Sequence, residues 1–264
     1  MDAVLADMVA TARAAGALTQ RHFAGFRDMA IGIKGPADFV SDADRESELL
    51  IRERLGDLYP DWSFTGEEFP PVDKADQAYR WLVDPIDGTT NFVNGMHYTI
   101  SIALRRGNVT LAGALYNPVS DEMFTAIRGQ GGFLNGVRLQ VSAQADVGLF
   151  AVGTGLPIST LHSFAGYYQR LEKIRDPIGC IRIVGSSANS CAYVACGRLT
   201  GYFEESGLVD WAVGVLLVEE AGGVVTDWWG RGPEFYEASG MVIVANPANH
   251  AWLIEQLRDA PRKD

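Results

Sequence analysis

The chain has 264 residues, of which 47% are hydrophobic and 10% aromatic, so it can bury a large core and is not an intrinsically disordered protein. Its formal net charge of −11 argues against non-specific binding to nucleic acid, which requires a basic surface. It has neither an apolar stretch of about 18 residues nor an N-terminal signal peptide, so we expect a soluble, cytoplasmic protein rather than a membrane protein.

Two amphipathic helices are predicted at the start of the chain. Apolar residues recur at helical spacing over residues 2–24 and again over 42–58, with a break at Gly35-Pro36 between them. Strand-like runs follow at 62–64, 81–83, 98–104, 111–116 and 122–126. The short connections between the later runs favour antiparallel neighbours. Residues 1–144 are therefore expected to form a mainly antiparallel α+β half.

From about residue 145 the pattern changes to alternating strands and helices. The predicted strands are 150–152, 181–184, 200–204, 223–226 and 241–245, and the predicted helices are 161–174, 187–196, 210–221 and 248–257. This alternation predicts an α/β half over residues 145–264. The chain contains no repeat or linker, so we expect one layered domain over residues 1–264. Nucleotide-binding glycine motifs of the P-loop and Rossmann types are absent from the sequence.

The segment 81–92, Trp-Leu-Val-Asp-Pro-Ile-Asp-Gly-Thr-Thr-Asn-Phe, is the most informative part of the sequence. Asp84 and Asp87 follow a short strand three residues apart, and Pro85 between them favours a turn. Gly88 allows the backbone to approach a ligand closely, and Thr89 suits the first turn of a short helix. Two hard oxygen ligands would then lie beside free N–H groups, an arrangement that binds a divalent cation together with a phosphate.

Other polar segments have two interpretations each. Gly66-Glu67-Glu68 is either a metal-binding turn or a solvated bend, and Asp210 is either a ligand or a helix cap. In the run 38–44, Asp42 would cap the following helix and Asp44 would complement its dipole. Gly185-Ser186-Ser187 is either a cap or an anion site.

Taken together, these segments resemble the inositol monophosphatase family of Mg²⁺-dependent, lithium-sensitive phosphatases. The matching segments are Asp38-Phe39-Val40-Ser41-x-x-Asp44, Gly66-Glu67-Glu68, Asp84-Pro85-Ile86-Asp87-Gly88-Thr89-Thr90-Asn91-Phe92 and Asp210-Trp211-Ala212-x-Gly214. The likeness extends over nearly the whole chain. It implies a five-layer αβαβα sandwich of the sugar-phosphatase type, the hydrolysis of a small phosphate monoester, and a homodimer. For the dimer, Phe150, Leu156 and Tyr167 are the candidate apolar face.

The resemblance also implies roles for individual residues. A first Mg²⁺ would be bound by Glu67, Asp84 and the carbonyl of Ile86; a second by Asp84, Asp87 and Asp210; a third, weaker ion by Glu67. Thr89, oriented by Asp44, would position or deprotonate the attacking water, and the N–H groups of Gly88 and Thr89 would bind phosphate oxygens. The alcohol part of the substrate would be read by Ser186 and by Glu204 or Glu205. Lys34 and Asp38 would lie near the active-site loop and tune metal affinity.

The substrate that this resemblance favours is myo-inositol 1-phosphate. Thr90 matches the inositol monophosphatase form of the motif, where histidinol-phosphate phosphatases commonly carry Lys. Two departures leave the substrate open: Val209 stands where many relatives have Trp, and the loop that leads to Asp210 is shorter than usual. Histidinol phosphate, fructose 1,6-bisphosphate, NADP and 3′-phosphoadenosine 5′-phosphate are the alternative substrates. Regulatory binding to the transcription machinery is the alternative of another class.

Overall fold

The computed structural model describes residues 1–28, 31–35, 38–74, 78–156 and 164–258. The side chains of Lys34 and Asp38, which were predicted to tune metal affinity, lie outside the described part. Their backbones belong to a two-stranded antiparallel hairpin of β1 (Ile31–Gly35) and β2 (Asp38–Ser41). The sequence analysis predicted no strands here.

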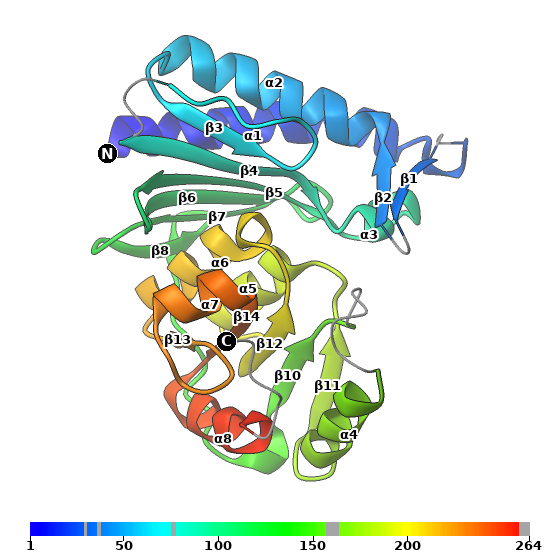
Figure 1. Ribbon diagram of the computed structural model, residues 1–264, viewed down its shortest axis with the longest axis vertical. Helices are drawn as coiled ribbons and strands as arrows, with labels where there is room; N and C mark the ends of the chain where they lie inside the picture. Colours follow the sequence, from blue (N-terminus) through cyan, green and yellow to red (C-terminus); the bar gives the residue numbers. More distant parts are fainter. Residues whose placement is uncertain (29–30, 36–37, 75–77, 157–163, 259–264) are drawn as a thin grey trace.

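Helices and sheets alternate in five layers (Figure 1). The helices are α1 (Asp2–Phe23) and α2 (Asp42–Leu58) in the first layer, α5 (Ser187–Ala195) and α6 (Leu208–Glu220) in the middle layer, and α4 (Phe164–Arg175) and α8 (Pro247–Leu257) in the last layer. A seven-stranded and a five-stranded sheet separate these layers. The expected αβαβα sandwich is confirmed.

The first sheet is mainly antiparallel, as predicted. Its strands, in spatial order, are β3 (Ser63–Gly66), β4 (Tyr79–Asp87), β5 (Thr99–Arg106), β6 (Val109–Asn117), β7 (Glu122–Ile127), β8 (Gly131–Leu134) and β9 (Val137–Arg138). Only β3 and β4 run parallel among these neighbours. Because β3 and β4 are parallel, their carboxyl ends meet at the same edge of the sheet, where predicted metal ligands lie within β4 and directly after β3.

The second sheet is mixed. Its strands, in spatial order, are β11 (Cys180–Ile183), β10 (Ala151–Thr154), β12 (Gly201–Glu205), β14 (Met241–Ala245) and β13 (Val224–Thr226). Strand β10 is parallel to both of its neighbours, whereas β14 is antiparallel to both of its own. The short helices α3 (Thr89–Val93) and α7 (Pro233–Ser239) and the 3₁₀ turns at Phe26–Asp28 and Val147–Leu149 complete the described elements.

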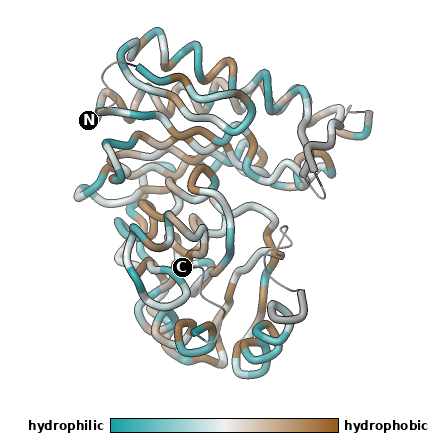
Figure 2. Tube along the Cα trace, viewed as in Figure 1, coloured by the Kyte–Doolittle hydropathy of each residue, from teal (hydrophilic) through white to brown (hydrophobic). Residues whose placement is uncertain are grey.

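Helix α6 differs from the outer helices because it lies between the two sheets. Residues 211–218 are all buried, whereas α1 buries only one face, which includes Met8, Ala12 and Ala15. The outer helices accordingly alternate between apolar and polar residues along their length (Figure 2). Burial on both sides fixes α6 in the core, so its first turn, which carries Asp210, has a defined position relative to both sheets.

The apolar face expected for a homodimer is wrong in two of its three residues. Phe150 and Tyr167 are buried in the core between the second sheet and its outer helices, and only Leu156 is exposed. The strand and helix patterns that made these side chains conspicuous in the sequence reflect the internal core. No helix in the described part of the chain is long and apolar enough to cross a bilayer.

Candidate active site

Five predicted acidic residues from four separate parts of the chain interact with one another. They are Asp44 in the first turn of α2, Glu67 just after β3, Asp84 and Asp87 in β4, and Asp210 in the first turn of α6, and we call them the carboxylate cluster. The pKa of Asp84 is raised well above its ordinary value, first by burial and then by the negative charges of the other four. The structure therefore brings the residues of the carboxylate cluster together.

Strand β4 continues beyond the point where the sequence predicted it to end. Asp84 pairs with Ser101 of β5, the register then shifts, and pairing resumes between Asp87 and Thr99. The predicted turn is thus a bulge within the strand, which places both carboxylates close to the sheet edge. The Asp84 carboxylate accepts a hydrogen bond from the N–H of Ile86 at 3.0 Å, and Asp84 is only 2% exposed.

Gly88 is required by both its backbone conformation and its surroundings. Its φ of 94° is left-handed, and a Cβ there would lie 3.0 Å from the carbonyl oxygen of Gly185. Asn91 in α3 also donates a hydrogen bond to the carbonyl of Val184 at 2.8 Å. The loop before α5 therefore packs directly on the turn that follows Asp87.

Asp87 accepts hydrogen bonds from donors on two elements. Its carboxylate binds the N–H groups of Ser187 at 3.2 Å and Ala188 at 3.0 Å, and the hydroxyl groups of Thr99 at 3.1 Å and Ser186. Burial nevertheless raises the pKa of Asp87 to about 6, although these hydrogen bonds oppose the shift. In the structure the Ser186 hydroxyl contacts Asp87 and accepts from the N–H of Asn189, so Ser186 also caps α5.

Thr89 and Asp44 form the predicted pair. The Thr89 hydroxyl lies 3.1 Å from the Asp44 carboxylate and 3.2 Å from the carbonyl oxygen of Ile86, either of which can accept its single proton. Asp44 in turn accepts from the N–H of Ser41 at 2.8 Å and from its hydroxyl at 2.6 Å. The residue that precedes α2 is therefore Ser41, and the alternative prediction that Asp42 caps this helix is wrong. Burial raises the pKa of Asp44.

Asp210 lies in the first turn of α6, where it accepts from the N–H of Gly207 at 2.9 Å. This contact supports the interpretation of Asp210 as part of the helix cap, whereas its role as a metal ligand stays a prediction. Burial, with the charge of Asp87 next in size, raises the pKa of Asp210 to about 7. The predicted helix start at residue 210 is two positions late, since α6 begins at Leu208.

Glu204 lies beside the carboxylate cluster but is held by other side chains. It accepts from the hydroxyl of Ser187 at 2.5 Å and from that of Tyr202. Burial raises its pKa to about 8, and a Cβ on Gly155 would collide with its carboxylate. Glu205, the other candidate for the alcohol contact, ends β12 and pairs in register with Met241.

The predicted metal-binding atoms suit a hard divalent cation by type and charge. They are the carboxylate oxygens of the carboxylate cluster and the carbonyl oxygen of Ile86, which are ligands that Mg²⁺ prefers. Among the described residues, no Lys or Arg forms an ion pair with Asp84, Asp87 or Asp210. In the same part of the chain, no three His, Cys, Asp or Glu side chains stand close enough to enclose a metal by themselves. The carboxylates instead hold nearby N–H and hydroxyl groups, so we expect metal binding to exchange some of these bonds.

Sequence reasoning missed three residues around the carboxylate cluster. Thr99 donates to Asp87, Ser47 donates to the carbonyl of Pro85 at 3.3 Å, and Glu48 accepts from the N–H of Glu68 at 2.6 Å. Ser47 and Glu48 follow Asp44 by three and four positions, which places all three on one face of α2. That spacing is visible in the sequence and is the signal from which Ser47 and Glu48 could have been predicted.

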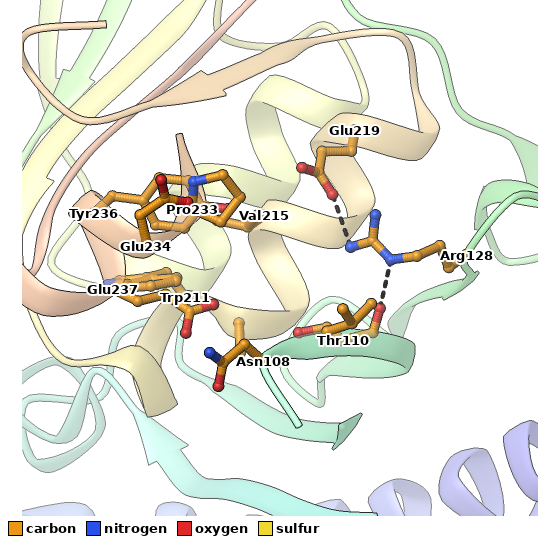
Figure 3. A pocket seen from close by; sticks show the side chains of 12 residues that line it. Asn108, Thr110, Arg128, Trp211, Val215, Glu219, Pro233, Glu234, Tyr236 and Glu237 are labelled. Atoms are coloured by element: carbon orange, nitrogen blue, oxygen red, sulfur yellow. Dashed lines mark hydrogen bonds and ion pairs between the residues drawn. The ribbon is translucent and has the colours of Figure 1, made fainter. Parts of the chain in front are cut away.

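A separate pocket of about 240 Å³ lies between the β5–β6 turn, α6 and α7 (Figure 3). Trp211 and Tyr236 form part of its wall, and Arg128 there donates to Glu219 at 2.9 Å and to the carbonyl of Thr110 at 2.7 Å. No member of the carboxylate cluster lines this pocket. It therefore does not belong to the candidate site.

Comparisons with known proteins agree with this geometry. Residues 1–262 match the model of the family described as the inositol monophosphatase family. An inositol-1-monophosphatase of Rhizobium meliloti is 40% identical over 247 residues, which cover 92% of each chain. The Nus factor SuhB of Escherichia coli is 36% identical over 262 residues, 98% of this chain and 97% of the relative. The crystal structure of the extragenic suppressor protein suhB from Bartonella henselae superposes with a TM-score of 0.93 at 36% identity, covering 98% of this chain and 100% of the other.

Proposed function

This chain belongs to the inositol monophosphatase family and is a phosphoric monoester hydrolase, and from that premise we propose that it hydrolyses myo-inositol 1-phosphate with the help of Mg²⁺. The observation that carries the proposal is the carboxylate cluster itself. Burial, and after it the charges of neighbouring carboxylates, raises the pKa values of Asp84 and Asp210, and neither forms an ion pair with a Lys or Arg in the described part of the chain. We assign the adjoining turn at Gly88 to the phosphate group.

We assign the metal ligands as the family resemblance implies. Glu67, Asp84 and the carbonyl of Ile86 would hold one Mg²⁺, and Asp84, Asp87 and Asp210 a second, with Glu67 also reaching toward a third, weaker ion. When bound, these cations supply positive charge against the phosphate dianion, the attacking water and the departing alkoxide. The surplus negative charge of the chain is thus in part a metal site.

Thr89 and Asp44 are assigned to the attacking water. When the Thr89 hydroxyl donates to Asp44 rather than to the carbonyl of Ile86, a lone pair of Oγ1 remains to accept a hydrogen bond from that water. The raised pKa of Asp44 makes its carboxylate a better proton acceptor than an ordinary aspartate. The N–H groups of Gly88 and Thr89 would orient the phosphate oxygens.

The alcohol part of the substrate would be read by Ser186 and by Glu204 or Glu205. The hydroxyls of Ser187 and Tyr202 already occupy Glu204, which favours modest discrimination among alcohols. We therefore expect glycerol 2-phosphate to follow inositol 1-phosphate within roughly 10–100-fold in kcat/KM, a gap of about 1.4–2.7 kcal/mol.

A phosphate-release screen with Mg²⁺ tests this proposal. The substrates are inositol 1-phosphate, glycerol 2-phosphate, histidinol phosphate, fructose 1,6-bisphosphate, NADP and 3′-phosphoadenosine 5′-phosphate. Inositol 1-phosphate should be turned over fastest, with inhibition by lithium and by Ca²⁺, whose larger coordination shell misplaces the reacting groups. Faster turnover of histidinol phosphate or of a nucleotide would refute the substrate but not the mechanism. A preference above about 10⁴ for inositol phosphate would refute the expected modest discrimination among alcohols.

A second candidate is a regulatory binding role in transcription. It is favoured by the name Nus factor of the SuhB relatives, which are 35–36% identical to this chain. A pull-down from native extract with wild type and a catalytically inactive variant separates the two functions. A partner that both proteins capture would establish a binding role independent of catalysis.

A further inference from the structure

Helix α2 carries a buried polar stripe that contacts three segments of the site. Asp44, Ser47 and Glu48 are each no more than 1% exposed, although all three are polar. Asp44 accepts from Thr89 at the start of α3, and Ser47 donates to the carbonyl of Pro85 in β4. Glu48 accepts from the backbone beside Glu67. One helix face therefore contacts all three segments, of which β4 and the turn at Glu67 carry most of the proposed metal ligands.

Glu48 is the charged member of this stripe to which no role has been assigned. One carboxylate oxygen accepts from the N–H of Glu68 at 2.6 Å, and the other accepts from Arg52 at 2.9 Å. Gly66 packs against the same carboxylate so closely that a Cβ there would lie 2.2 Å from it. The Glu48 carboxylate thus touches the residues on both sides of Glu67.

Burial of the Glu48 carboxylate costs free energy. A charged carboxylate with no exposed surface must be compensated by hydrogen bonds and a cation, and Arg52 supplies the cation. Arg52 also donates to the carbonyl of Pro70 at 3.2 Å, beyond the glutamate turn. The Glu48–Arg52 pair therefore holds the turn at two points, at Glu68 next to Glu67 and at Pro70 three residues from Glu67.

We propose that Glu48 is a positioning residue that fixes Glu67 relative to Asp84 and thereby sets the affinity of the site for divalent cations. It acts through the backbone of the 66–68 turn and touches neither metal nor substrate. This inference rests on the proposed role of Glu67 as a metal ligand. Partners that orient metal ligands typically change metal affinity by about 10–100-fold when they are removed.

The test compares Glu48→Gln and Glu48→Ala with a matched control. Glu220→Gln is that control, because Glu220 also accepts two backbone N–H groups of a turn, from Gly129 and Gly131 at 2.7 Å each. Glu220 ends α6, about 15 Å along the helix from Asp210 at 1.5 Å per residue. The readouts are the dissociation constant of Mg²⁺ by calorimetry and the hydrogen exchange rate of the Glu68 amide in metal-free protein.

We expect Glu48→Ala to raise the Mg²⁺ dissociation constant at least about tenfold and to deprotect the Glu68 amide. Glu48→Gln, which keeps an acceptor for that amide, should lie between Ala and wild type, and Glu220→Gln should bind Mg²⁺ like wild type. If Glu48→Ala does not fold, Gly66→Ala disturbs the same contact from the side of the turn and should weaken Mg²⁺ binding equally.

Unchanged Mg²⁺ affinity in the Glu48 variants, with wild type binding Mg²⁺ normally, would overturn this inference and leave the proposed function intact. Equal loss of affinity in Glu220→Gln would also overturn it, because the effect would then be general destabilisation. The exchange measurement needs no metal. A Glu68 amide that stays protected in Glu48→Ala therefore overturns the positioning role, whether or not wild type binds Mg²⁺. Absence of Mg²⁺ binding by wild type would by itself refute the proposed function.

Discussion

Replacement of Asp87 by Asn should separate the stability of the metal-free protein from its activity. Burial raises the pKa of Asp87 from 3.8 to about 6, so above that pH its ionised form destabilises the metal-free fold by about 3 kcal/mol at 1.36 kcal/mol per pKa unit. Asn removes this cost, but its amide cannot accept a hydrogen bond on both sides. If its oxygen keeps the Thr99, Ser186 and Ala188 donors, the N–H of Ser187 loses its acceptor, which costs about 1–3 kcal/mol.

The metal-free Asp87→Asn protein should therefore be as stable as wild type or more stable by up to about 2 kcal/mol, from the difference of these two costs. Turnover should fall by at least about 10²-fold, since the lost charge acts on the transition state. Urea unfolding in EDTA at pH 8 and phosphate release in saturating Mg²⁺ measure the two effects.

Asp227→Asn is the matched control, because Asp227 is also fully buried but is paired with Arg231 at 2.6 Å. It should lose stability, since it breaks an ion pair, and keep its turnover per folded molecule. Near-normal turnover of Asp87→Asn would refute the two-metal assignment. A large loss of its metal-free stability would refute the argument that the charge of Asp87 destabilises the fold.

Three further predictions concern pH, the glycine turn and assembly. The folded-state pKa values of Asp87 (about 6) and Asp210 (about 7) are raised, so they contribute stability that is fully present below the unfolded value near 4 and is lost as pH rises through 6–7. The Tm in EDTA should therefore fall from pH 5 to 8, and Mg²⁺ should restore the Tm most at high pH. A Tm in EDTA that rises over this range would contradict the shifts. Gly88→Ala should abolish phosphate release and lower the urea midpoint by more than Gly107→Ala. Both glycines have a positive φ, but only at Gly88 would the new Cβ lie 3.0 Å from a neighbouring carbonyl oxygen. We expect a homodimer in sedimentation at micromolar concentration, and a monomer would refute the assembly that the family resemblance implies.

Much of the fold is predictable from local sequence patterns. Helices α1 and α2 and the strands β5 to β7 follow from periodicity, because each buries one face or lies wholly within a sheet. The hairpin of β1 and β2, the strands β8 and β9 and the helix α7 were not predicted, since they are short and carry little periodicity of their own. The bulge in β4 was read as the end of the strand, because Pro85 marks a break but not the resumption of pairing at Thr99.

Site residues were predictable where their own sequence motif indicates their chemistry. They were not predictable where their environment depends on hydrogen-bond partners from distant parts of the chain. The motif that contains Asp84 and Asp87 is enough to predict both as metal ligands. The hydrogen bonds of Glu204 to Ser187 and Tyr202 depend on how β12 packs against α5, which no local pattern encodes. The same holds for the burial of Phe150 and Tyr167, whose side chains are as apolar in a core as at an interface.

The packed layers of the fold hold the residues of the carboxylate cluster at fixed positions relative to one another. Asp210 lies at the end of a helix packed between two sheets, and Asp84 lies at the edge of one of those sheets, so their mutual repulsion cannot be relieved by moving the elements apart without opening the core. The repulsion is instead expressed as raised pKa values, which bound cations would reverse. Relief of this repulsion would add to the affinity of the proposed site for divalent cations.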